Sequence, residues 1–181
     1  MRIIGALNHY LMSSIIIGLI IFCLLKVLEI LLKKIIKKEH AECRLITCIF
    51  QFIFIVYLVG VLSITGGYIV FIEGFPEFFM SANLIPVVNT IQDIIGNPPE
   101  MISQIGYNIA LFVPFGFLLP YSFPNNKWNW KRVLLFSVIT ILIVEGLEFL
   151  SGRYFDVDDI IINGTGSLLG YGAYQIIHVG K

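Results

Sequence analysis

Charged residues are scarce in this chain. They make up 13% of the 181 residues, whereas soluble domains carry about 25%. Hydrophobic residues reach 57% of the sequence. This balance excludes an ordinary soluble domain and predicts an integral membrane protein.

Cysteine and histidine are also rare, with three of each. Their positions match no spacing typical of a metal site, and we expect no disulfide framework. The sequence also lacks a nucleophile motif and a phosphate-binding loop. These absences count against an enzyme.

Long apolar runs are plentiful. A membrane-spanning helix needs about 20 mostly apolar residues. Five segments meet or approach this length, at residues 11–32, 45–62, 102–120, 133–150 and 160–179. The sequence predicts an all-α integral membrane protein built as a bundle of about five transmembrane helices.

Basic residues gather in the loops after the first and third segments and are rare in the other loops. The residues concerned are Lys33, Lys34, Lys37, Lys38, Arg44, Lys127, Lys131 and Arg132. Because lysine and arginine favour the cytoplasmic side, we expect the N-terminus outside and the C-terminus in the cytoplasm. This topology accounts for the basic residues, so nucleic acid is not an expected partner.

The longest loop, residues 66–100, lies on the predicted outer side. Residues 68–80 are rich in aromatic side chains, which favour the headgroup layer. Residues 83–95 carry apolar side chains at helical spacing, which indicates a short amphipathic, interfacial or re-entrant segment. It could be a rim that captures an amphiphile or a loop packed over the bundle.

A polar cluster follows the fourth apolar segment. It contains Arg153, Asp156, Asp158, Asp159 and Asn163. Charges beside a bilayer are costly to desolvate, so these side chains need partners or a function. Asp158 is the expected cap of the fifth helix, because a carboxylate favours the first free amides.

Further polar side chains occur inside the spans. Glu145 and Glu148 are three residues apart on one face of the fourth segment, and Gly166 and Gly170 form a GxxxG that permits close helix packing. We expect this packing to gather one outward-facing ligand-binding pocket. Its predicted residues are Asn108, Glu145, Glu148, Arg153, Asp156, Asp158, Asp159 and Asn163.

The pocket is open to several interpretations. Glu145, Glu148 and Asp158 are candidate catalytic residues, since carboxylates transfer protons. Asp156, Asp158 and Asp159 are candidate ligands of a divalent cation. The alternative is structural, with the carboxylates paired to Arg153 and the helices simply locked together.

Three blocks of sequence resemble the VanZ-like family. They are residues 83–86 (Asn-Leu-Ile-Pro), residues 108–120, and a set that begins at Glu145 and continues through residues 152–171. The chain has Glu148 where the family commonly has glutamine, and Val87 where it commonly has phenylalanine. The expected organisation is an N-terminal helix pair with a basic cytoplasmic loop, residues 1–65, and a VanZ-like domain, residues 66–181.

The resemblance implies a multi-pass protein of the bacterial plasma membrane that contributes to resistance against teicoplanin-type glycopeptides. The function that we predict is binding of a lipid or lipophilic ligand. Membrane lipids, a lipid-linked cell-wall precursor and a lipoglycopeptide are the candidate partners. The alternatives are a divalent-metal-dependent enzyme acting on an envelope lipid head group and a small proton-coupled transporter.

Overall fold

The computed structural model describes residues 2–35, 45–66, 74–76, 82–83, 85–124 and 126–179. These residues form six helices and two short strands: α1 (Arg2–Ile35), α2 (Leu45–Thr65), β1 (Ala82–Asn83), α4 (Val88–Gly96), α5 (Pro98–Ser122), α6 (Trp130–Leu150), β2 (Phe155–Asp156) and α7 (Val157–Val179). The all-helical membrane fold predicted from the sequence is confirmed. The aromatic residues predicted at the interface, 68–80, lie largely outside the described residues.

Within this part of the chain, three helices are long and apolar enough to cross a membrane, namely α2, α5 and α6. Helices also form at the first and fifth predicted segments, as α1 and α7. The predicted number of five spans is thus approximate.

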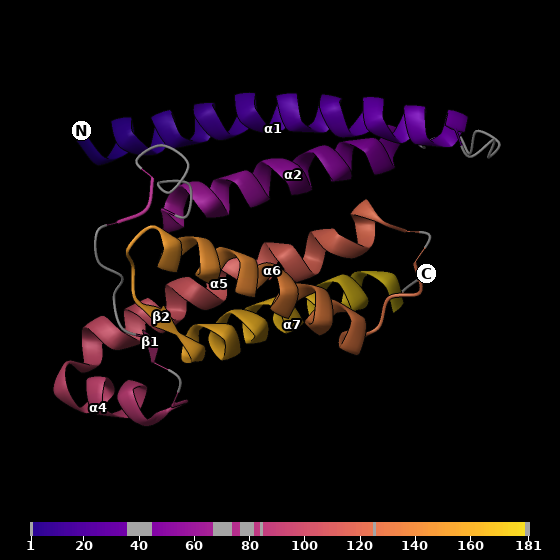
Figure 1. The fold of residues 1–181 in the computed structure, drawn as a ribbon. Coiled ribbons are helices and arrows are strands. Elements are labelled where there is room, and N and C mark those ends of the chain that lie inside the picture. The colour runs from indigo at the N-terminus through magenta and orange to yellow at the C-terminus, as the bar shows by residue number, and fades with distance from the viewer. Residues whose placement is uncertain are drawn as a thin grey trace.

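The helices lie in successive layers (Figure 1). α1 packs along α2 at one edge of the bundle, and α2 packs on α5. α7 packs on both α5 and α6. The core contains Phe54, Val61, Phe112, Phe115, Leu118, Leu119, Val133, Ile141, Val144 and Tyr171. Many apolar side chains of α1 and α2 face outward, as expected of helices surrounded by lipid.

Glycines set the distance between α5 and α7. A Cβ atom at Gly166 would lie 2.3 Å from the carbonyl oxygen of Ile109, and one at Gly170 would lie 1.9 Å from that of Val113. From the other side, a Cβ at Gly116 would lie 1.7 Å from the carbonyl oxygen of Ser167. The two backbones are therefore in direct contact, as the GxxxG predicted.

Hydrogen bonds from hydroxyl groups link α6 to α7 and α2 to α5. Ser137 of α6 donates a hydrogen bond to Ser167 of α7, with 2.6 Å between the buried oxygens. The Tyr57 hydroxyl of α2 donates to the Leu111 carbonyl oxygen of α5 at 2.8 Å. Cys23 is free, whereas Cys48 is disulfide-bonded. The expectation of no disulfide framework did not foresee this bond.

Candidate functional site

A two-residue parallel ladder organises one end of the bundle. Ala82 pairs with Phe155, and Asn83 pairs with Asp156. The Asn83 side-chain amide also donates to Asp156 Oδ1 at 3.1 Å. The segment before α4 is thereby fixed against the connection between α6 and α7.

Asp156 caps α7. Its Oδ1 accepts the backbone N–H of Asp158 at 2.9 Å, one of the amides that a helix start leaves unpaired. The prediction from the sequence placed this cap at Asp158. It was wrong by two residues, because α7 begins at Val157 and so places Asp156 at the capping position.

Asp158 instead holds the start of α4. Its Oδ1 accepts the Val87 backbone N–H at 2.8 Å, and its Oδ2 accepts the Thr90 hydroxyl. Val87 has a φ of 72°, a left-handed conformation that is costly for a β-branched residue. The amphipathic segment predicted at 83–95 is helical only over Val88–Gly96, because the residues before it turn back toward Asp158.

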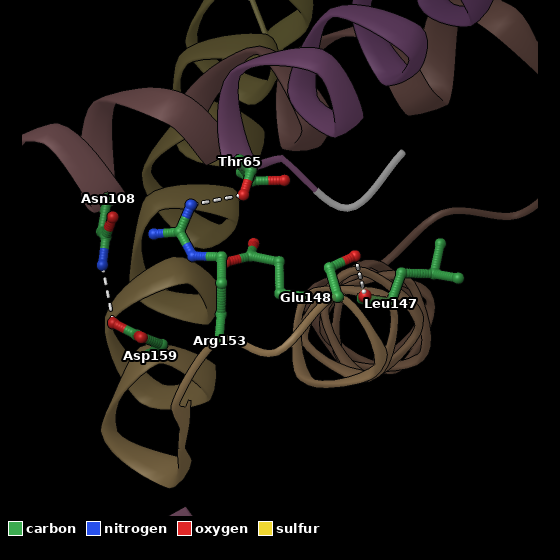
Figure 2. Close-up of polar contacts among 7 residues, drawn as sticks. Thr65, Asn108, Leu147, Glu148, Arg153 and Asp159 are labelled. Atoms are coloured by element: carbon green, nitrogen blue, oxygen red, sulfur yellow. Dashed lines mark hydrogen bonds and ion pairs between the residues drawn. The ribbon is translucent and has the colours of Figure 1, made fainter. Parts of the chain in front are cut away.

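Arg153 connects three parts of the chain (Figure 2). Its Nε lies 3.3 Å from Glu148 Oε2 on α6, and its guanidinium donates to the Thr65 carbonyl oxygen at the end of α2 with an N–O distance of 2.6 Å. Glu148 is buried, whereas the Arg153 side chain is exposed over about half its surface. The predicted pairing of Arg153 with a carboxylate is confirmed for Glu148.

A second contact joins α5 to α7. The Asn108 side-chain amide donates to Asp159 Oδ1 at 2.6 Å (Figure 2). Asn108 and Asp159 are half-buried and belong to the pair of helices that the glycines hold together. The start of α7 thus presents Asp158 toward α4 and Asp159 toward α5.

A cavity of about 890 Å³ lies beside these contacts. Its walls come from α2, α5, α6, α7 and the connection that carries Arg153. The lining residues are Ile64, Thr65, Glu100, Ser103, Gln104, Tyr107, Asn108, Leu111, Phe112, Val144, Glu145, Glu148, Arg153, Asp159 and Asn163. The volume lies within the range of small-molecule binding sites.

Glu145 also lines the cavity, but unlike Glu148 it forms no close ion pair with Arg153. The residue is only 4% exposed, yet within the described part of the chain its carboxylate has no hydrogen-bond donor and no ion-pair partner. Asn163, at 5% exposed, contributes a buried side-chain oxygen that is also unpaired in this part of the structure. A buried acceptor such as Asn163 Oδ1 is costly unless something donates to it.

Six of the eight predicted ligand-binding residues line the cavity, whereas Asp156 and Asp158 do not. No three His, Cys, Asp or Glu side chains in the described residues are placed to hold a metal ion. A cation site at Asp156, Asp158 and Asp159 and catalytic roles for Glu145, Glu148 and Asp158 stay predictions.

The predicted site residues did not include several residues that line the cavity, among them Thr65 and Tyr107. Thr65 supplies the carbonyl oxygen for Arg153, although α2 carries no motif that could have indicated it. Tyr107 lines the cavity and is 75% exposed. Its position next to Asn108 was the available signal.

Comparison with known proteins gives one match. The model of the VanZ/LLP1 family matches residues 45–178, which leaves out α1 and includes every residue of the cavity. No curated protein and no solved structure matches the chain.

Proposed function

Because the chain belongs to the VanZ/LLP1 family, we propose that it is a bacterial cell-envelope protein that binds a lipid or another amphiphile in the cavity beside Glu145. The observation that carries this proposal is the mixed lining of the cavity. Charged groups such as Glu145 and Arg153 lie near apolar side chains such as Leu111 and Val144. An amphiphile has both a polar end and an apolar chain to match such a surface.

The distribution of charge along α6 supports an outward-facing cavity. Lys131 and Arg132 belong to the first turn of this helix, and Glu145 and Glu148 lie near its other end. Because basic residues favour the cytoplasmic side, the cavity then opens toward the outer leaflet. The N-terminus lies outside and the C-terminus in the cytoplasm in this proposal.

The natural ligand in this proposal is a membrane lipid, a lipid-linked cell-wall precursor or a lipoglycopeptide. Capture of such a molecule at the outer leaflet would reduce sensitivity to teicoplanin-type antibiotics. A deletion strain would then become more sensitive to teicoplanin, and its envelope lipids would change. Unchanged sensitivity together with unchanged lipids would contradict the proposed cellular role.

Binding can be tested directly with a photoreactive long-chain alcohol in phosphatidylcholine nanodiscs that contain the full chain. We expect labelling of the cavity-lining part of α5, residues 103–112, as mapped by mass spectrometry. Ser103→Trp would obstruct the exposed edge of the cavity and reduce this labelling. Ala110→Trp is a matched control, since Ala110 is exposed on the same helix and outside the cavity lining.

Labelling spread evenly over the lipid-facing surface, and equally in both variants, would contradict a binding cavity. The two alternative functions, a metal-dependent enzyme acting on a lipid head group and a proton-coupled transporter, stay predictions.

A further inference from the structure

The cavity has an excess of negative charge. Among the described residues that line it are four carboxylates and one guanidinium, and none of these lining residues is a lysine or a histidine. The carboxylates belong to Glu100, Glu145, Glu148 and Asp159. A ligand that enters this space therefore meets mainly oxygen acceptors.

The guanidinium of Arg153 is already engaged. It pairs with Glu148 at 3.3 Å and donates to the Thr65 carbonyl oxygen at 2.6 Å. These contacts pair the guanidinium with Glu148, and within the described residues neither Glu145 nor Asp159 forms a close ion pair with it. A phosphate group would approach these carboxylates with like charge, which is unfavourable.

The buried acceptors add a second and independent requirement. Asn163 Oδ1 and Thr65 Oγ1 are buried without a hydrogen-bond partner among the described residues. Glu145 is 4% exposed, and no side chain or backbone group in this part of the chain donates to it. By contrast, Asp159 receives the Asn108 amide. A donor that enters the cavity can therefore be accepted by Asn163 Oδ1 or by Glu145, both of which line it.

We propose that the cavity selects an amphiphile with a primary ammonium head group, which is bound beside Glu145. This specificity rests on the proposed function, because it names the head group of the bound amphiphile. An ammonium group supplies both a positive charge and three N–H donors. Tyr107, exposed at the edge of the cavity, can attract the same cation with its aromatic face as it enters.

The experiment compares photoreactive probes that share one alkyl chain and differ only in the head group. The probes carry a primary amine, a trimethylammonium, a phosphate or an alcohol, and each is presented to the full chain in phosphatidylcholine nanodiscs. We expect the amine to label the cavity-lining part of α5 at a concentration about ten-fold lower than the alcohol does, as a charge-assisted hydrogen bond implies. The phosphate should label least.

Replacing the carboxylate tests which residue carries the selectivity. Glu145→Gln keeps the size of the side chain and removes its charge, so the preference for amine over alcohol should fall to near unity. Glu29→Gln is the matched control, because Glu29 is a carboxylate of α1 that is paired with Lys26 and does not line the cavity. It should keep the full preference. The comparison among head groups on the unmodified chain does not depend on whether either variant folds.

Each other outcome identifies what has failed. Equal labelling by amine and alcohol, or stronger labelling by phosphate, would overturn ammonium selectivity and leave amphiphile binding intact. Labelling by trimethylammonium as strong as that by the amine would overturn N–H donation, and displacement of the amine by millimolar Ca²⁺ would assign the site to a metal ion instead. If no probe labels the cavity, the proposed function fails as well.

Discussion

The carboxylate of Asp158 accepts the backbone N–H of Val87 at 2.8 Å, across 71 residues of sequence. Through this bond the first turn of α7 fixes the start of α4. Asp158 is 5% exposed and does not line the cavity. Its contacts join two segments of the protein.

Replacing Asp158 with alanine should release α4. Both acceptors for Val87 and Thr90 would be lost, and each partly buried hydrogen bond of this kind contributes about 0.5–1.5 kcal/mol. Amide hydrogen exchange of residues 85–96 should accelerate, while that of α5 and α6 stays unchanged. Asp158→Asn, which keeps one acceptor oxygen, should have a smaller effect. Unchanged exchange in Asp158→Ala would show that other contacts hold α4.

Val87→Gly should be neutral or stabilising, although glycine usually destabilises ordered segments. The φ of 72° at Val87 is strained by about 1–3 kcal/mol for a residue with a side chain, and glycine removes this strain. Thermal unfolding measures the difference. Ile91→Gly is the control, because Ile91 lies in α4 and glycine there should cost about 1 kcal/mol. Equal destabilisation by the two variants would argue against the strain.

Gly170→Ala should strongly destabilise the bundle. The added Cβ would lie 1.9 Å from the Val113 carbonyl oxygen, so α5 and α7 would have to separate. We expect a cost of at least about 1–3 kcal/mol, measured as a lower unfolding temperature in detergent. The Cβ atom added by Gly172→Ala, on the same helix, would meet no heavy atom within 4 Å, so this variant should be tolerated. Similar unfolding temperatures for the two variants would contradict the close contact.

Arg153→Gln should cost more stability in the unmodified chain than in a Glu148→Gln background. Without the guanidinium 3.3 Å away, the buried Glu148 carboxylate would lose its charged partner. The double variant removes both charges together. A double-mutant cycle in thermal or denaturant unfolding should therefore give a coupling of about 0.5–3 kcal/mol. Additive effects would show that the pair contributes no net stability.

The long helices and the glycine contact between α5 and α7 could be predicted from the sequence because each is encoded locally. Apolar runs of membrane length give α2, α5 and α6, and small residues at helical spacing give the close contact. The gathering of Asn108, Glu145, Asp159 and Asn163 on one cavity also followed from those spacings.

Which aspartate caps α7 and which one binds the start of α4 could not be predicted from the sequence. Whether Asp156 or Asp158 caps α7 depends on where the helix starts, and a shift of two residues exchanges their roles. The contact of Arg153 with Thr65 was also hidden, since it uses a backbone carbonyl that has no sequence signature. Such contacts depend on tertiary packing rather than on local pattern.

The glycine contact has a mechanical consequence for the cavity. Because Gly116, Gly166 and Gly170 leave no space between the backbones of α5 and α7, these helices form one stiff wall that includes Asn108 and Asp159. The cavity can then widen or narrow by displacement of α6, of α2 or of the connection that carries Arg153. Glu145 belongs to α6, so its carboxylate lies on the side of the cavity whose distance from a bound ligand can change.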